Sequence, residues 1–273
     1  MTAPIRQFDA PEPIASPDAI VAHAVPGDSE RLLVVCSGLG APSAPIPAPE
    51  FVDLAVNGVR AHAMFLADPK RSWMNAAGVA EAMVDVIERY STANGVTEVA
   101  AIGHSMGGFA AIQLANLMPI STVLAFAPQF SMDAALVPEE QRWRGYGNAI
   151  GDWRFRDIGS LAAEGTRYVI VHGSNQAEAA HWMRFPHRED TVDHYILAGQ
   201  AHNLAAVLVK RQIMGPLVRN ALVGKRRAVR SALEKSFLGR RFSVRMRGDY
   251  MAEHPELTLV PGGAPVIYPE DLA

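Results

Sequence analysis

The 273-residue sequence is poor in cysteine, in charge and in long apolar runs, and each shortage excludes something. Its one cysteine, Cys36, excludes an intramolecular disulfide, so nothing indicates an oxidising compartment. No uncharged apolar run approaches the roughly 20 residues that a membrane-spanning helix needs. Residues 1–8 lack the basic start and apolar core of a signal peptide. We therefore expect a cytoplasmic protein without a transmembrane segment.

The charge that is present is unevenly distributed along the chain. Hydrophobic residues make up 49% of the sequence and charged residues 19%, which is typical of a globular protein. The net charge is only −3, yet the stretch from Lys210 to Arg247 holds twelve Lys or Arg and a single acid, Glu234. This segment predicts an anionic partner, with a solvated amphipathic helix as the open alternative. Nucleic acid is not a partner that we expect.

Apolar runs and helical periodicity predict an α/β fold. Residues 31–36 and 122–127 are continuous apolar runs, typical of strands buried on both faces of a parallel sheet. The other predicted strands cover 18–25, 60–66, 96–102, 167–172 and 192–197, and the predicted helices cover 76–90, 109–117, 177–185 and 201–209. Strands and helices that alternate in this way predict a mostly parallel central sheet with helices on both faces.

The pattern divides the chain into three parts. Residues 1–17 are predicted to form an extended arm, 18–210 a core, and 211–273 a basic C-terminal extension. The core contains an aperiodic insert, 130–165, that is rich in tryptophan, tyrosine and arginine and predicts a functional loop or small cap. In the extension, one basic helix is expected over 219–237; its predicted apolar anchors are Leu222, Val223, Val229, Leu233 and Phe237.

Residues 103–107 read Gly-His-Ser-Met-Gly, between an apolar strand and a helical pattern. A G-x-S-x-G sequence in a strand–turn–helix context predicts a nucleophile elbow, in which Ser105 is exposed at a sharp turn. Side chains at Gly103 and Gly107 would collide with the neighbouring backbone there. The helix that follows directs its N-terminal N–H groups at the place where negative charge would develop.

This elbow, the strand order and the turn at 199–203 resemble the α/β-hydrolase superfamily over roughly residues 18–210. The resemblance implies a catalytic triad in the chain order nucleophile, acid, base. Ser105 would be the nucleophile, and His202, just past the last predicted strand, the base. Eight other histidines compete with His202, but none of them has its position after that strand.

The acid is the least determined member of the predicted triad. Glu178 is the first carboxylate after the strand that ends near residue 172, where the family commonly has its acid. Its spacing from His181 is also similar to that in some bacterial polysaccharide-associated hydrolases of the superfamily. Asp190 and Asp193 are alternative acids, and Asn175 could orient an imidazole without a charge.

The resemblance also implies an oxyanion hole made of two backbone N–H groups. Met106 would supply one, and Leu39 or Gly38, in the glycine-bearing turn after Cys36, the other.

Arg71, Trp73 and Trp143 are candidate substrate-binding residues, because flat rings stack on sugars and guanidinium groups bind anions. They could equally pack the loops together. The sequence has no phosphate-binding glycine loop, zinc-type cluster or dinucleotide fingerprint, so we expect no metal and no cofactor.

These residues favour a serine hydrolase that cleaves an ester-type acyl bond of a small molecule or a glycan. Acyl transfer to another acceptor would use the same residues. The alternative from a different class is a catalytically weak accessory or binding protein in glycan or envelope assembly.

Overall fold

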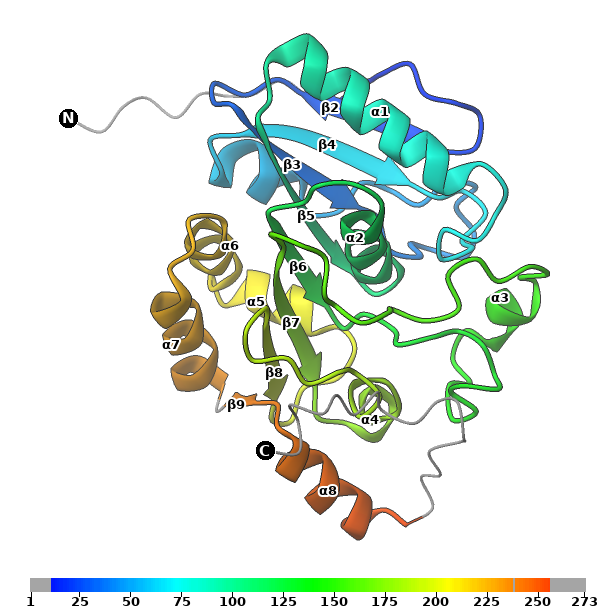
Figure 1. Ribbon diagram of the computed structural model, residues 1–273, viewed down its shortest axis with the longest axis vertical. Coiled ribbons are helices and arrows are strands. Elements are labelled where there is room, and N and C mark those ends of the chain that lie inside the picture. Colours follow the sequence, from blue (N-terminus) through cyan, green and yellow to red (C-terminus); the bar gives the residue numbers. More distant parts are fainter. Residues whose placement is uncertain (1–10, 238, 256–273) are drawn as a thin grey trace.

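A computed structural model describes residues 11–237 and 239–255 of the chain. Its strands form a sheet in the order β1-β2-β4-β3-β5-β6-β7-β8-β9 (Figure 1). They are β1 (Glu12–Pro13), β2 (Val21–Val25), β3 (Arg31–Cys36), β4 (His62–Ala67), β5 (Glu98–His104), β6 (Thr122–Phe126), β7 (Arg167–Gly173), β8 (Val192–Leu197) and β9 (Arg240–Arg241). The helices are η1 (Leu54–Gly58), α1 (Val79–Asn94), α2 (Met106–Leu117), α3 (Arg144–Asn148), α4 (Gln176–Trp182), α5 (Leu204–Lys210), α6 (Met214–Leu222), α7 (Arg226–Phe237) and α8 (Val244–Glu253).

The six central strands, β4-β3-β5-β6-β7-β8, pair in parallel, whereas β1, β2 and β9 add antiparallel edges. Parallel pairing brings the carboxyl ends of β3, β5, β6, β7 and β8 to one edge of the sheet. Open α/β sheets bind ligands at this edge. The elbow, the predicted oxyanion turn and the predicted acid and base all follow strands that end there.

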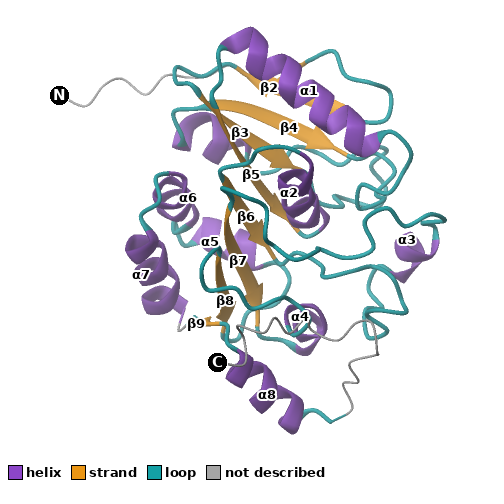
Figure 2. Cartoon of the chain, viewed as in Figure 1, coloured by secondary structure: helices purple, strands orange, loops and turns teal. Residues whose placement is uncertain are grey.

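Helices cover both faces of the sheet (Figure 2). On one face α1, α2 and part of the insert bury residues such as Met83 and Phe109. On the other face η1, α5, α6 and α7 bury residues such as Leu208, Leu217 and Leu233. The predicted mostly parallel sheet with helices on both faces is therefore confirmed.

The prediction of one helix over 219–237 was wrong. The structure has two helices, α6 and α7, separated by a turn in which Gly224 has a φ of +69°. That left-handed conformation ends a helix readily when the residue is glycine. Val223, a predicted anchor, lies in this turn and is 54% exposed, whereas Leu222, Val229 and Leu233 are buried as expected. The side chain of Phe237 lies outside the described part of the chain.

Both predicted appendages contribute to the sheet or its helical layers. In the N-terminal arm, β1 pairs with β2, and residues 1–10 lie outside the described residues. In the C-terminal extension, α6 and α7 supply part of the core and β9 pairs with β8. Residues 256–273, at the end of this extension, likewise lie outside the described residues. None of the helices described is long and apolar enough to cross a bilayer.

Candidate active site

Ser105 lies between β5 and α2 in a strained backbone conformation, with a φ of 58° and a ψ of −126°. A positive φ is uncommon for a residue with a side chain, and such strain concentrates at functional sites. Two glycines make the turn sterically feasible. A Cβ atom on Gly103 would lie 2.1 Å from the carbonyl oxygen of Gly107, and one on Gly107 would lie 2.1 Å from that of Cys36. The local geometry is that of a nucleophile elbow.

The predicted base and the first-choice acid are hydrogen-bonded to each other. His202, in the turn between β8 and α5, has its Nδ1 atom 2.9 Å from Glu178 Oε1, on α4. Glu178 is 1% exposed and the His202 side chain is 20% exposed. A carboxylate at Nδ1 fixes the neutral tautomer that carries its proton there, which leaves Nε2 as the proton acceptor.

The alternative acids are engaged elsewhere. Asp193 is paired with Arg226 at 2.6 Å, and Asp190 lies 3.7 Å from an arginine in an exposed loop. Asn175 caps α4, because its side chain accepts a hydrogen bond from the backbone N–H of Glu178 at 3.0 Å. Among the four candidates for the acid, the structure brings only Glu178 to His202.

Several competing histidines have other partners in the interior. His172 Nε2 donates to a backbone carbonyl oxygen at 2.8 Å, and its Nδ1 lies 2.9 Å from His194 Nε2. His181 Nδ1 accepts from a backbone N–H at 3.1 Å. His104 Nε2 donates to the carbonyl oxygen of His202 at 2.7 Å. His104 therefore helps to hold the turn that carries the predicted base.

Arg142, in the insert, binds the same carboxylate that His202 contacts. Its Nη1 lies 2.6 Å from Glu178 Oε1, and its Nη2 lies 2.6 Å from Glu140 Oε2. Burial alone would raise the pKa of Glu178, but the hydrogen bond and charge of His202, with further charge from His172 and Arg142, lower that pKa well below its usual range. Glu178 is therefore ionised at neutral pH.

A second carboxylate, Glu140, completes this network. His181 Nε2 donates to Glu140 Oε2 at 2.9 Å, because His181 Nδ1 is already used as an acceptor. Burial raises the pKa of Glu140, yet hydrogen bonds from His181 and Arg142 outweigh it and lower the pKa to about 2. The Arg142 guanidinium is thus shared between the buried carboxylates of Glu178 and Glu140. Neutral His181 donates a hydrogen bond to Glu140.

Gln129, just past the carboxyl end of β6, contacts the nucleophile directly. Its Nε2 donates to Ser105 Oγ at 3.0 Å, and its Oε1 accepts from Trp73 Nε1 at 3.1 Å. An indole N–H can only donate, so this second bond determines which end of the amide faces the serine. Gln129 is fully buried and Trp73 is 1% exposed. Trp73, a predicted substrate-binding residue, contacts Gln129 behind the nucleophile.

Arg71 supports the predicted oxyanion turn. Its guanidinium donates to the carbonyl oxygens of Leu39 at 2.9 Å, Ala41 at 3.3 Å and Ala44 at 2.6 Å, and the residue is 8% exposed. These bonds hold the loop that follows β3 against the loop that follows β4. Arg71 therefore has a loop-holding role in the structure, and its contact with a substrate stays a prediction. Met106 begins α2, where a backbone N–H has no intrahelical partner.

The insert lies over the predicted base. The rings of Trp143 and His202 have centroids 4.5 Å apart, and Arg142 lies 4.3 Å above the Trp143 ring. Ser105 itself is only 4% exposed. Trp143 thus lies beside the predicted base, and its contact with a substrate stays a prediction. Within residues 11–237 and 239–255, no group of three or more His, Cys, Asp or Glu is arranged to hold a metal ion.

Sequence reasoning missed three residues of this site: Gln129, Arg142 and Glu140. Gln129 follows a strand that ends at the same edge as the elbow strand, and that position was the available signal. Arg142 directly precedes Trp143 in the arginine-rich insert, but no periodicity indicates which arginine turns inward. Nothing in the sequence separates Glu140 from its neighbour Glu139.

Comparison with protein-family models and with curated protein sequences gives no match. Solved structures with a similar fold include a capsule O-acetyltransferase of Neisseria meningitidis serogroup A. It is 12% identical, with a TM-score of 0.51 over 74% of this chain and 92% of that one. A membrane phospholipase A, described as a bacterial virulence factor, is 16% identical, with a TM-score of 0.51 over 80% and 86%. An α/β serine hydrolase from Xanthomonas campestris is 11% identical, with a TM-score of 0.46 over 85% and 98%.

The likenesses to the O-acetyltransferase and the phospholipase agree with the topology described above. A mostly parallel sheet, an elbow after β5 and a histidine turn after β8 together define the class. The chain has the α/β-hydrolase fold.

Proposed function

We propose that this chain is a serine hydrolase that cleaves an ester-type acyl bond through an acyl-enzyme. The observation that carries the proposal is the 2.9 Å contact between His202 Nδ1 and Glu178 Oε1, in the turn that follows β8 of a fold whose elbow holds Ser105. A serine hydroxyl is a poor nucleophile unless a neighbouring base takes its proton. Glu178 would hold the imidazole and stabilise the imidazolium that forms.

The reaction proceeds in two halves. Ser105 Oγ attacks the ester carbonyl carbon while its proton moves to His202, and the oxyanion is held by the N–H groups of Met106 and Leu39. The intermediate collapses, the alcohol leaves with the proton from His202, and the acyl group stays on Ser105. A water molecule then repeats the sequence: it attacks the acyl carbon, its proton passes through His202 to Ser105 Oγ, and the free acid departs.

Labelling with a fluorophosphonate probe tests the nucleophile. The wild type is expected to form a covalent adduct that maps to the peptide containing Ser105, and Ser105→Ala to form none. Ser131, which is fully buried and bonded to a backbone carbonyl, offers a matched control. Ser131→Ala should retain the label. An unlabelled wild type, or equal labelling of Ser105→Ala, would refute the proposal.

For the alcohol part of the substrate, we favour a polar group such as a glycan. The insert places aromatic rings and arginines near the site, including the Trp143 ring beside His202, and such groups suit sugars. Comparison of acetylated sugars with simple aryl esters tests this substrate class, and a preference for esters of long-chain alcohols would contradict it.

Acyl transfer is the second candidate function. A solved structure at 13% identity and a TM-score of 0.50 is a capsule O-acetyltransferase mutant described as a complex with CoA. Transfer would use the same acyl-enzyme, with a sugar hydroxyl in place of water as the acceptor. Product analysis in the presence of a sugar acceptor separates the two reactions, because only transfer yields an acylated sugar.

The accessory-protein alternative rested on an uncertain acid and on the basic C-terminal segment. Glu178→Gln tests the first point: a turnover equal to that of the wild type would mean that the acid is assigned wrongly.

A further inference from the structure

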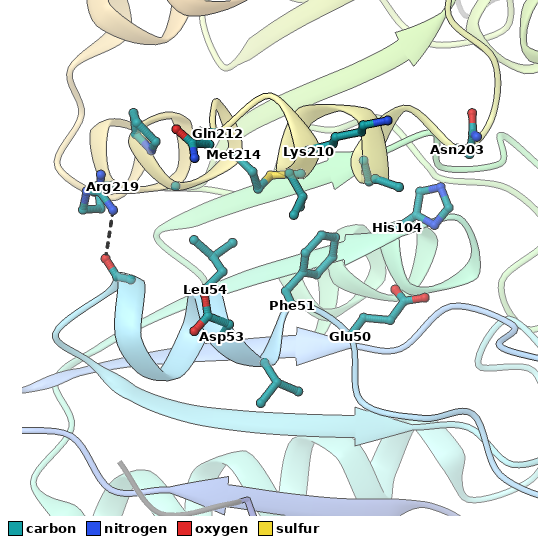
Figure 3. A pocket seen from close by; sticks show the side chains of 17 residues that line it. Glu50, Phe51, Asp53, Leu54, His104, Asn203, Lys210, Gln212, Met214 and Arg219 are labelled. Carbon is teal, nitrogen blue, oxygen red and sulfur yellow. Dashed lines mark hydrogen bonds between the residues drawn. The ribbon is translucent and has the colours of Figure 1, made fainter. Parts of the chain in front are cut away.

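A groove of about 760 Å³ lies between η1 on one side and α5 and α6 on the other, on the face of the sheet that α1 and α2 do not cover (Figure 3). This volume is in the range of small-molecule sites, roughly 300–1,000 Å³. Phe51, Leu54 and Met214 project into its middle, and Arg219 lies at the end farthest from His104. Its walls are predominantly apolar, so its chemistry suits a hydrocarbon chain.

One end of the groove adjoins three segments of the proposed catalytic machinery: the elbow, the oxyanion loop and the histidine turn. Glu50, His104 and Asn203 line this end. His104 immediately precedes the nucleophile, and Asn203 immediately follows the proposed base, so each is one Cα–Cα step of about 3.8 Å from a catalytic residue. A Cβ atom on Gly38, in the proposed oxyanion loop, would lie 3.0 Å from Glu50 Oε1. The groove therefore begins between the oxyanion loop and the histidine turn.

At this end of the groove, Glu50 and His104 carry less charge at neutral pH than the same side chains would in water. Burial raises the pKa of Glu50 to about 7, against a hydrogen bond from the backbone of Gly38 that lowers it. The other carboxyl oxygen, Oε2, is buried without a hydrogen-bond partner among the described residues. His104 is held neutral, because burial lowers its pKa to about 4. A carboxyl group that is half protonated near neutral pH and a neutral imidazole border the passage, which favours an apolar occupant.

We propose that this groove binds the aliphatic chain of the substrate's acyl group, which makes the substrate an ester of an acid several methylenes long. This inference rests on the proposed function. At the tetrahedral carbon, one oxygen points to the Leu39 and Met106 N–H groups and the leaving oxygen points to His202. The acyl chain takes a remaining direction, and the groove starts between these two sets of groups.

Chain-length profiles test the proposal. We would measure kcat/KM for p-nitrophenyl esters from acetate to decanoate. For the wild type, kcat/KM is expected to rise about two- to fourfold for each methylene that enters the groove. Ala206, on α5, is exposed and lines the groove, so Ala206→Trp fills it without disturbing the core. In this variant the ratio of kcat/KM for decanoate to kcat/KM for acetate should fall at least about tenfold relative to wild type.

Ala93 provides the matched control, because it is an exposed alanine near the end of α1, on the opposite face. Ala93→Trp should have the wild-type profile. A wild-type profile that falls steadily from acetate, or an Ala206→Trp profile equal to that of the wild type, overturns the acyl groove. If Ser105 is still labelled by the fluorophosphonate in that case, the proposed function survives. If no ester is cleaved and no label forms, both proposals fail together.

Discussion

At the scale of single residues, the site depends on how Ser105 is held. Its φ of 58° directs the side chain out of the turn, and the neighbouring glycines permit that conformation. Gln129 then occupies one lone pair of Ser105 Oγ with a donated N–H at 3.0 Å. The hydroxyl proton is thereby left for the base. The same N–H would stabilise negative charge on Oγ whenever Oγ is the leaving group.

Replacement of Gln129 tests this role. Gln129→Leu is expected to lower kcat by about 10- to 100-fold, as removal of a hydrogen-bond donor from a reacting oxygen generally does. Trp73→Phe removes the indole N–H that orients the amide, so it should lower kcat in the same direction and by less. Steady-state kinetics on one ester suffices for the measurement. An unchanged kcat in Gln129→Leu would exclude Gln129 from the reaction.

At the residue scale, the Gly-x-Ser-x-Gly spacing between a strand and a helical pattern predicted the sharp turn at Ser105, because that turn demands particular residue types. The position of His202 past the last central strand, and of Glu178 past β7, came from the resemblance to α/β-hydrolases. Gln129 and Arg142 could not be predicted in this way, because their roles depend on how a loop and an aperiodic insert fold over the sheet.

At the scale of elements, the insert 130–165 contacts Glu178, the proposed acid, and also covers His202, the proposed base. Arg142 shares its charge between Glu178 and Glu140, at 2.6 Å from each. A cation beside the acid weakens the attraction between that acid and a protonated His202. Glu140 limits the effect, because it competes for the same guanidinium. We propose that the insert in this way sets how strongly Glu178 supports His202 as a base.

Two substitutions in this network should shift the pH–rate profile in opposite directions. Arg142→Gln removes the cation that partly neutralises Glu178, so Glu178 attracts a protonated His202 more strongly. The pH at the midpoint of the acid limb of kcat/KM should therefore rise by about 0.5 to 1 unit. Glu140→Gln removes the second carboxylate that Arg142 contacts, so Arg142 neutralises Glu178 more fully. The midpoint should therefore fall. His172 and His181 also face Glu178 and are unchanged in both variants. If both variants lose activity equally and the midpoint does not shift in opposite directions, the network only stabilises the fold and does not influence His202.

Element-scale prediction from sequence was accurate for buried strands and less so for amphipathic helices. The continuous apolar runs at 31–36 and 122–127 coincide with β3 and, to within one residue, with β6. By contrast, the apolar anchors expected over 219–237 gave no sign of the break at Gly224, since an apolar pattern can continue through a tight turn. The strand β9 was missed because two arginines carry no hydrophobic pattern. Its place is determined by tertiary pairing with β8.

At the scale of the whole molecule, much of the basic charge in the C-terminal extension is used internally. Arg226 and Arg241 pair with Asp193, at 2.6 Å and 3.5 Å, and Arg247 donates to a buried backbone carbonyl oxygen at 2.6 Å. The helices that carry the extension also supply part of the core. An anionic partner remains a prediction, and it now concerns the outward side chains of α7, such as exposed Arg227.

The buried histidines predict how the stability of the fold depends on pH. Burial lowers the pKa of both His104 and His172 to about 4, and that of His194 well below its usual value. The unfolded chain then binds more protons than the folded protein between about pH 4 and 6.5, so stability falls as the pH falls through that range. Glu50, with its pKa raised to about 7, acts in the opposite direction and offsets about one histidine.

The free energy of unfolding should therefore decrease by at least about 2 kcal/mol from pH 7 to pH 5. His104 and His172 contribute about 2 kcal/mol each, Glu50 offsets about 2 kcal/mol, and His194 adds to the decrease. Urea denaturation at the two pH values measures it. Glu50→Gln should enlarge the decrease, because it removes the opposing group. Equal or greater stability at pH 5 in the wild type would contradict this account of the interior.

The central claim is that Ser105 and His202 act as one unit. The most direct measurement is kcat/KM for Ser105→Ala, His202→Ala and the double variant on a single ester. We predict that each single variant lowers kcat/KM by at least about 10³-fold and that the double variant is no slower than either one. Removal of one member already prevents the other from acting, so the second substitution costs nothing more. Losses that multiply in the double variant, or a single variant near wild-type activity, would contradict the account.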